Sequence, residues 1–253
     1  MRVSENRFKA ALARDERQIG LWSTLGSAAV AELIGHAGYD WVLIDTEHSP
    51  NELPAIVAQL QAMQTGTASA VVRPAWNDPV LIKRILDIGV QSLLIPFVET
   101  AEAARAAVAA TRYPPDGIRG VSTGSRAAGY GRIKDYVKAA GAEICVLVQI
   151  ETMKGVDNID AIAAVPGVDG VFVGPNDLAA SMGHLGDTMN PVVQDTIGRV
   201  LAACQKAGKP AGYLTGNEAE AKKWLDAGYR FVAVGTDNGS LTKAVDELRG
   251  RFR

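Results

Sequence analysis

The chain has 253 residues, 47% of them hydrophobic, and its 26 basic and 28 acidic side chains give a formal net charge of −2. A chain of this length can bury one large core, and barrel domains of this size form undivided. The charges are interspersed and only 6% of residues are aromatic, so the sequence lacks the basic stripe and the stacking platform of a nucleic-acid-binding protein.

The amino-terminal residues 1–18 are charged and helix-like, without the apolar run of a signal peptide. No stretch approaches the roughly 18 consecutive apolar residues that cross a membrane. We therefore expect a cytoplasmic protein without membrane contacts. Two cysteines cannot form a disulfide framework in a chain of this size, and Cys145 and Cys204 lie in apolar patterns, so both are expected to be small core residues.

Eight short apolar runs rich in β-branched residues follow along the chain. Nearly all are bounded by turn formers or polar residues, which is typical of strand ends. The runs occupy residues 18–24, 40–47, 69–75, 92–98, 143–151, 168–175, 210–215 and 231–236.

Helical patterns rich in Ala, Leu, Glu and Lys separate these runs. They cover residues 27–38, 52–64, 78–89, 101–112, 192–208 and 218–228. Four of them end at a glycine, as expected after the last helical turn: Gly38, Gly89, Gly208 and Gly228.

Alternation of continuous apolar strands with helices predicts a parallel sheet covered by helices, an α/β fold. Eight such units predict a closed (β/α)8 TIM barrel that forms a single domain over residues 1–253. A doubly wound open sheet is the alternative, and it is disfavoured because no G-x-G-x-x-G follows the first strand. The long irregular segment 117–131 is expected to be a lid, a binding loop or a contact arm.

Polar residues gather after the carboxyl ends of the predicted strands, where barrels of this kind carry their chemistry. The second strand ends in Asp45, followed by Glu47 and His48, and the third carries Arg73. The remaining ones are Gln149 and Glu151 at the end of the fifth strand and the run Gly174, Pro175, Asn176 and Asp177 after the sixth.

Strand alternation suggests how two of these carboxylates meet. Gln149 and Glu151 share one face of the fifth strand, and Val171, Val173 and, roughly, Asp177 share one face of the sixth. If both faces point inward, the two carboxylates repel each other unless a proton or a cation lies between them. Mg²⁺ or Mn²⁺ would resolve the repulsion. The alternative is that both carboxylates cap helix amino termini.

The histidines and Arg73 allow two further interpretations. His36 lies in a helical pattern and His184 in a loop, whereas His48 follows an acidic strand end, where proton transfer is plausible. Arg73 lies in an otherwise apolar strand and needs an anion. A substrate carboxylate would serve, and so would an internal ion pair with Asp45 or Asp87. No predicted strand carries a lysine, which disfavours Schiff-base chemistry.

Five motifs together carry a family resemblance that spans nearly the whole chain. They are IDTEHSPN (44–51), VVRPAWNDP (71–79), RYPPDGIRGV (112–121), LVQIET (147–152) and GVFVGPNDLAASMG (170–183). In this combination the chain resembles the HpcH/HpaI family of metal-dependent, class II pyruvate aldolases.

The resemblance implies a role for each matching residue. Glu151 and Asp177 match the metal ligands, for Mg²⁺, Mn²⁺ or Co²⁺, and Gln149 matches a residue that contacts pyruvate. Arg73 matches the arginine that stabilises the transition state, with Asp45 as a catalytic neighbour. His48 matches the general base, supported by Asp87. The implied substrate contacts are Gly174, Pro175, Asn176, Asp177 and Leu214, with Asn176 replacing the Ala or Ser of some relatives.

The implied activity is reversible cleavage of 4-hydroxy-2-oxo acids to pyruvate and an aldehyde through a metal-stabilised enolate, in aromatic or sugar acid catabolism. The resemblance also implies a homo-oligomer, a hexamer, with contacts from the carboxyl-terminal helix. Two alternatives stay open: a lyase of the citrate-lyase or malyl-coenzyme-A type, for which the sequence shows no clear basic groove, and a non-catalytic barrel that binds a metabolite.

Overall fold

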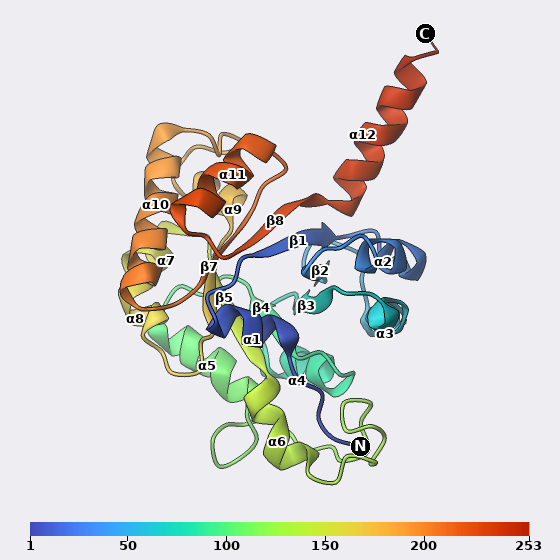
Figure 1. Ribbon diagram of the computed structural model, residues 1–253. Helices are drawn as coiled ribbons and strands as arrows, with labels where there is room; N and C mark the ends of the chain where they lie inside the picture. The colour runs from blue at the N-terminus through green and yellow to red at the C-terminus, as the bar shows by residue number, and fades with distance from the viewer. Residues whose placement is uncertain (253) are drawn as a thin grey trace.

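Eight parallel strands close into a barrel in the order β1 to β8 (Figure 1). The computed structural model describes residues 1–252. All eight predicted runs form strands, and the predicted (β/α)8 barrel is confirmed. The strands are β1 Gln18–Ser23, β2 Trp41–Asp45, β3 Ser69–Arg73, β4 Ser92–Ile95, β5 Cys145–Ile150, β6 Gly170–Val173, β7 Ala211–Leu214 and β8 Phe231–Thr236.

Helices connect successive strands, and the glycines predicted to end them all have positive φ, with Gly228 at 119° after α11. The first helix precedes β1, and the last follows β8. The helices are α1 Arg7–Ala13, α2 Ala28–Gly35, α3 Leu53–Ala62 with the 3-10 turn η1 Met63–Thr65, α4 Pro79–Asp87, α5 Ala101–Thr111, α6 Tyr136–Glu143, α7 Met153–Asp157, α8 Ile159–Ala163, α9 Pro175–Ser181, α10 Pro191–Lys206, α11 Glu218–Ala227 and α12 Asp237–Gly250.

Two layers of apolar side chains form the core. Alternate residues of the strands fill the barrel interior, where the rings of Trp41 and Phe231 meet Phe8 of α1 and Phe172 packs against Phe231. The other strand residues, mostly Val and Ile, pack against the helices. Cys145 is buried inside the barrel and Cys204 under the helices, as expected for core residues.

We predicted that Val171 and Val173 of β6 face the barrel interior, and this prediction is wrong by one residue. Phe172 points into the barrel, whereas Val171 and Val173 pack against the helices. The strand ends at Val173 and α9 begins at Pro175, so alternation does not continue as far as Asp177. Asp177 therefore reaches the barrel mouth from a helix rather than from a strand face.

The segment 117–131 contains no helix or strand and packs against the end of α4. The backbone N–H of Ala127 donates to the carbonyl of Asp87 at 3.0 Å, and Arg126 Nη1 donates to the carbonyl of Ile88 at 2.6 Å. These contacts lie beside the amino-terminal ends of the strands. Within one chain, the segment therefore does not cover the carboxyl ends where the candidate residues gather.

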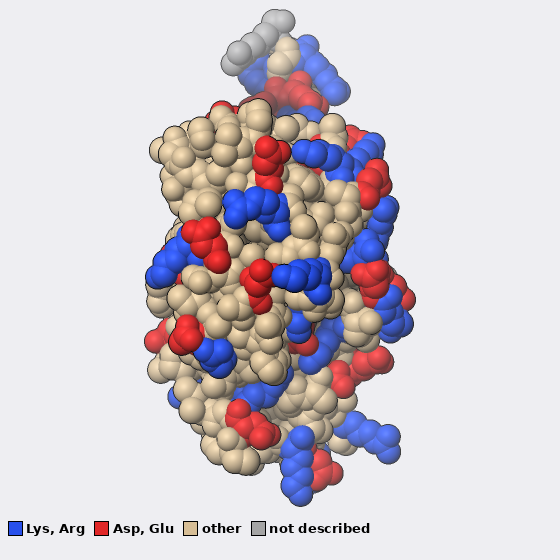
Figure 2. Space-filling view, turned by 90° about the vertical axis from the view of Figure 1, so that its left-hand side faces the viewer, with Lys and Arg blue, Asp and Glu red and all other residues tan. Residues whose placement is uncertain are grey.

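Helix α12 extends away from the barrel (Figure 1). The side chains of Leu241, Val245 and Leu248 form a stripe along it and are 54%, 50% and 55% exposed. Within residues 1–252, every helix is too short or too polar to span a bilayer. On the face shown in Figure 2, acidic and basic side chains are interspersed, so the charges there do not form a field of one sign.

We predict that Gly212→Ala destabilises the barrel. A Cβ at this position would lie 2.1 Å from the Phe231 ring, which is fully buried inside the barrel. Overpacking of this kind costs about 1 to 3 kcal/mol, and urea unfolding followed by circular dichroism would measure the loss. Gly198→Ala in α10 is the matched control: its Cβ would meet nothing closer than 4.0 Å, so the added methyl should stabilise the helix slightly. Equal stability of the two variants would contradict this packing.

Candidate active site

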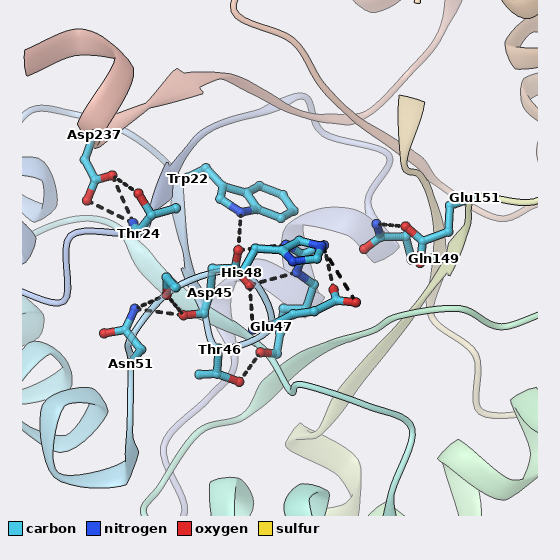
Figure 3. Close-up of polar contacts among 12 residues, drawn as sticks. Trp22, Thr24, Asp45, Thr46, Glu47, His48, Asn51, Gln149, Glu151 and Asp237 are labelled. Carbon is cyan, nitrogen blue, oxygen red and sulfur yellow. Dashed lines mark hydrogen bonds and ion pairs between the residues drawn. The ribbon is translucent and has the colours of Figure 1, made fainter. Parts of the chain in front are cut away.

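The barrel mouth gathers polar side chains from four parts of the fold. Asp45 ends β2, Arg73 ends β3, and these two residues are paired in the register of the sheet. Gln149 lies near the end of β5, with Glu151 immediately after the strand. Asp177 lies in the first turn of α9, which follows β6. The predicted residues at the strand ends thus lie around one opening, as Figure 3 shows for most of them.

Arg73 lies between two carboxylates. Its Nε and Nη2 donate to Asp45 Oδ1 and Oδ2 at 2.9 and 2.7 Å, and its Nη1 lies 2.8 Å from Glu47 Oε2. The guanidinium also stacks over the Trp22 ring, 5.0 Å from its centroid. Arg73 therefore forms the internal ion pair with Asp45 that the sequence left open as an alternative. This pair holds the guanidinium at the mouth.

Asp45 is almost fully buried and stays ionised because of Arg73. Burial alone would raise its pKa, but the hydrogen bonds and charge of Arg73 lower it overall. Trp22 Nε1 adds a donor at 3.3 Å. The Asp45 carbonyl accepts from Ser49 Oγ at 2.5 Å and Asn51 Nδ2 at 2.7 Å. These bonds fix the turn that carries Glu47 and His48.

Glu47 and His48 lie further from the barrel interior than Asp45. The Glu47 side chain is only 9% exposed, and burial raises its pKa against the opposing charge of Arg73. Its Oε1 lies 4.0 Å from His48 Nε2, and the His48 side chain is 62% exposed. His48 therefore faces the open side of the mouth, where a proton can be exchanged with a bound molecule or with solvent.

Gln149 and Glu151 form the opposite side of the mouth. Gln149 Nε2 donates to Glu151 Oε2 at 2.5 Å, and the backbone N–H of Phe97 donates to Oε1 at 2.7 Å. Phe97 has φ of 50°, a left-handed conformation that costs free energy in a non-glycine residue. The backbone of the turn after β4 is thus strained at Phe97, and in this conformation its N–H points at the Glu151 carboxylate.

Carboxylates outnumber cations around Glu151. Burial raises the pKa of Glu151 to about 7, the hydrogen bond from Phe97 opposes this rise, and the charges of Glu47 and Asp177 add to it. Asp177 also adds to the raised pKa of Glu47, for which burial is again the main cause. Glu151 and Asp177 therefore lie within electrostatic reach of each other, and a cation would relieve their repulsion.

Gly174 lies beside the side chains of Gln149 and Glu151. A Cβ on Gly174 would lie 2.6 Å from Glu151 Oε2 and 2.7 Å from Gln149 Nε2, so only glycine leaves this cradle open. Gln149 Oε1 is buried and has no hydrogen-bond partner among residues 1–252. Because buried polar atoms are normally satisfied, this oxygen points to a group that binds there. Within residues 1–252, no cluster of three or more His, Cys, Asp and Glu side chains is arranged to hold a metal ion.

A groove begins at Pro175, the residue after Gly174, and we call it the distal groove. It has a volume of about 540 Å³, and its lining includes Asn176, Leu214, Thr236 and Lys243. A volume of this size is typical of small-molecule sites. Another cavity, of about 500 Å³, is lined by Lys9 and Arg230 at the amino-terminal ends of the strands, away from the carboxylates.

The structure does not bring Asp87 to His48 within one chain. Helix α4 begins beside the carboxyl end of β3 and runs back along the barrel, so Asp87 in its last turn lies at the opposite end from the mouth. There Asp87 Oδ1 accepts from Arg119 Nη2 at 2.8 Å. The expected support of His48 by Asp87 and the alternative pairing of Arg73 with Asp87 are therefore both absent from a single chain, as residues 1–252 show.

Sequence reasoning assigned no role to two further residues of the site. Trp22 supports Arg73 and donates to Asp45, and its position near the carboxyl end of β1 was the available signal. Phe97 acts through its backbone N–H, which no residue type reveals. Glu47 was recognised only as a polar strand-end residue, although its side chain is nearly as buried as that of Arg73.

Comparisons with known proteins agree with this arrangement. The model of the family described as HpcH/HpaI aldolase/citrate lyase matches residues 18–244. The chain is 50% identical over 251 residues to the 5-keto-4-deoxy-D-glucarate aldolase of Salmonella newport (strain SL254), which covers 99% of this chain and 98% of that protein. A crystal structure of an HpcH/HpaI aldolase/citrate lyase family protein from Burkholderia cenocepacia J2315 has a TM-score of 0.95 and 44% identity, covering 98% of this chain and 99% of that one. An HpcH/HpaI aldolase from Desulfitobacterium hafniense DCB-2 has a TM-score of 0.90 and 28% identity, covering 96% and 95%.

We predict that Arg73→Ala lowers the free energy of unfolding as well as any activity. The substitution leaves Asp45 and Glu47 buried without their cation, and breaking a buried pair in this way costs about 3 to 5 kcal/mol. Thermal or urea unfolding would measure the change. Arg105→Ala is the control, because Arg105 pairs with Glu102 on the surface, where an ion pair contributes less than about 1 kcal/mol. A variant at position 73 as stable as this control would contradict the structural role.

Proposed function

Because the chain belongs to the HpcH/HpaI aldolase/citrate lyase family, we propose that it is a metal-dependent aldolase that reversibly cleaves 4-hydroxy-2-oxo acids to pyruvate and an aldehyde. One observation carries this proposal: the cradle of Gln149, Glu151 and Gly174 lies across the mouth from Arg73, with a buried Gln149 oxygen left for a ligand. The family also includes citrate lyases, but the 50% identity with an aldolase over the whole chain favours the aldolase reaction.

We propose that Glu151 and Asp177 hold a divalent ion, Mg²⁺, Mn²⁺ or Co²⁺. Their carboxylate oxygens are the ligands that hard cations prefer, and two protein ligands leave positions for water and for the keto acid. Gly174 leaves room beside Glu151 for such a complex. When bound, the ion supplies a Lewis acid that polarises the keto oxygen of the substrate.

The residues of the chain then supply orientation and proton transfer. Gln149 positions the pyruvate half through the second N–H of its Nε2, since the first donates to Glu151, and its free oxygen can accept from a water bound beside the ion. Arg73, whose five N–H donors are not all used by Asp45 and Glu47, stabilises the negative charge that develops on the enolate oxygen. His48 accepts the proton of the substrate 4-hydroxyl as the bond between C3 and C4 breaks, and Asp45 keeps Arg73 in place.

The substrate is proposed to be a sugar-acid derivative. The relative from Salmonella newport is named for 5-keto-4-deoxy-D-glucarate, and the substrate-side residues Pro175, Asn176 and Leu214 open into the polar distal groove. A groove lined by hydroxyl and amide groups suits a hydroxylated carbon chain better than an apolar one. The proposed role is therefore in sugar acid catabolism in the cytoplasm.

We also propose that the chain forms a homo-oligomer, a hexamer, through α12. The stripe of Leu241, Val245 and Leu248 is about half exposed on a helix that leaves its own barrel. Exposed apolar stripes of this kind normally bury themselves against a partner. A second copy of this chain is the simplest partner.

The central experiment measures pyruvate released from a 4-hydroxy-2-oxo acid. We expect release with added Mg²⁺, Mn²⁺ or Co²⁺ and loss of release with a chelator. Glu151→Gln and Asp177→Asn should abolish release and weaken Mn²⁺ binding measured by electron paramagnetic resonance, because each removes one anionic ligand. Release that persists in the presence of chelator would rule the metal-dependent reaction out.

We expect the binding of Mn²⁺ to depend on pH. Burial raises the pKa of Glu151 to about 7 in the metal-free protein, so below that pH a proton competes with the ion for this carboxylate. The Mn²⁺ affinity should therefore fall as the pH is lowered from 8 to 6 and level off above about 7. The Glu151→Gln variant removes the titrating carboxylate, so the Mn²⁺ affinity that it retains should lose this pH dependence.

For the assembly, we expect the triple variant Leu241→Ser, Val245→Ser and Leu248→Ser to lose mass in light scattering relative to the unmodified protein. The substitutions remove the apolar stripe and leave the barrel core unchanged, because all three side chains are exposed. Leu33→Ser on α2, where Leu33 is 71% exposed, is the control. A single-chain mass for the unmodified protein would refute the proposed oligomer.

A further inference from the structure

The ring of His48 is placed by the backbone that carries it. Within residues 1–252, the ring makes one polar contact, 4.0 Å between Nε2 and Glu47 Oε1, which is too long for a hydrogen bond. A general base has to lie within hydrogen-bond reach of the proton that it removes. The reach of His48 therefore depends on how firmly its segment of backbone is held.

This backbone belongs to the turn between β2 and α3, residues 46–51, which we call the His48 turn. Thr46 at its start is bonded to β3. In the described part of the chain, residues 47–51 make no backbone–backbone hydrogen bond. Glu52, the N-cap of α3, makes no capping bond through its side chain, and a cavity of about 120 Å³ lined by residues of α3 and α4 adjoins the turn. Side-chain hydrogen bonds must therefore hold the turn in place.

Asn51 provides the bonds that close the His48 turn. Its Nδ2 donates to the carbonyl of Asp45 at 2.7 Å and to Ser49 Oγ at 2.9 Å, and Ser49 Oγ donates to the same carbonyl at 2.5 Å. The side chain of Asn51 thus joins the last residue of β2 to the residue before the N-cap of α3 (Figure 3 shows Asn51 beside Asp45). Asn51 is only 4% exposed, so water does not compete for these bonds.

Gln59 of α3 fixes which way the Asn51 amide faces. With the amide reversed, the Asn51 oxygen would face the carbonyl of Asp45, and the bond between them would be lost. Gln59 Nε2 donates to Asn51 Oδ1 at 2.8 Å and to the carbonyl of Ala55 at 3.2 Å. Because a carbonyl only accepts, Ala55 holds the Gln59 amide with its N–H groups toward Asn51. The chain of bonds therefore has one direction, from α3 to the end of β2.

Stability alone does not account for a glutamine at position 59. The side chain is fully buried, and among residues 1–252 its Oε1 has no hydrogen-bond partner. A buried oxygen without a partner lowers stability, and methionine would fill nearly the same space without this cost. What glutamine adds is the N–H donor to Asn51.

We propose that Asn51 and Gln59 are positioning residues for proton transfer by His48. They act through the backbone of the His48 turn and not by contact with the reacting atoms. This inference rests on the proposed function, in which His48 accepts the proton of the substrate 4-hydroxyl, and it adds two residues that set the place of this base.

Gln59→Met tests the assignment because it removes the donor and keeps the length of the side chain. We expect kcat for pyruvate release to fall about tenfold, since a small displacement of a catalytic group is costly. KM should change less than about twofold, because the keto acid binds on the opposite side of the mouth. The midpoint of urea unfolding should stay unchanged, because the unpartnered oxygen is lost together with the hydrogen bond.

Gln205→Met is the matched control, since Gln205 lies on the exposed side of α10 and donates only to the carbonyl of Ala227, at 3.3 Å. It should leave kcat and KM unchanged. Asn51→Asp keeps the acceptor for Gln59 but lacks the N–H donors, so it should lose kcat as Gln59→Met does. An unchanged kcat in Gln59→Met would overturn the proposal.

A double-mutant cycle shows whether Gln59 acts through His48. His48→Asn removes the base, and adding Gln59→Met to it should cause no further loss of kcat, because a base that is absent cannot be displaced. A loss of about tenfold in both backgrounds would instead mean a general structural effect. That result would overturn the proposal.

A measurement without turnover separates this inference from the proposed function. The chain has three histidines, so the Cε1 signals of ¹³C-labelled histidine can be assigned by nuclear magnetic resonance, with His48→Asn identifying His48. In protein with Mg²⁺ and no substrate, Gln59→Met should shift or split the His48 signal and leave those of His36 and His184 in place. An unchanged His48 signal would refute the positioning role. Absence of pyruvate release from the unmodified protein would refute only the aldolase, and the histidine signals would still decide whether Gln59 places His48.

Discussion

The site depends on an imbalance of charge at the barrel mouth. Four carboxylates, those of Asp45, Glu47, Glu151 and Asp177, lie around the single guanidinium of Arg73. Two of them pair directly with it. Glu151 is buried and Asp177 is partly exposed, and neither makes an ion pair within residues 1–252. Because isolated charges are expensive to bury, a proton or a bound cation beside Glu151 would stabilise this arrangement. The proposed metal chemistry follows from this electrostatic requirement.

Several less obvious features keep the imbalance in place. Trp22 stacks against the guanidinium and donates to Asp45. Phe97 adopts a left-handed backbone conformation and donates to Glu151, and Gly174 lacks the side chain that would collide with this carboxylate. The last two features have a structural cost, in strain or in lost packing, and they leave a donor and space beside Glu151. Such costs concentrate at functional sites.

Much of the fold and of the mouth could be predicted from the sequence, because strand runs and their polar ends follow simple periodicities. Alternation along β5 correctly placed Gln149 and Glu151 together. It failed for β6, where the change from strand to helix at Pro175 interrupts the period. The role of Asp87 beside His48 was predicted from the family resemblance and not from the topology. Asp87 lies in the last turn of α4, which runs back along the barrel, so it lies at the end opposite to the mouth.

Helix α12 is tied to its own barrel at its first residue. Asp237 accepts hydrogen bonds from Ser23, Thr24 and Leu25 at the end of β1, whereas Leu241, Val245 and Leu248 further along the helix are about half exposed. The angle at which the helix leaves the barrel is therefore set at the turn after β1. A substitution in that turn would redirect the whole helix, and with it the apolar stripe, without altering any residue of the stripe itself.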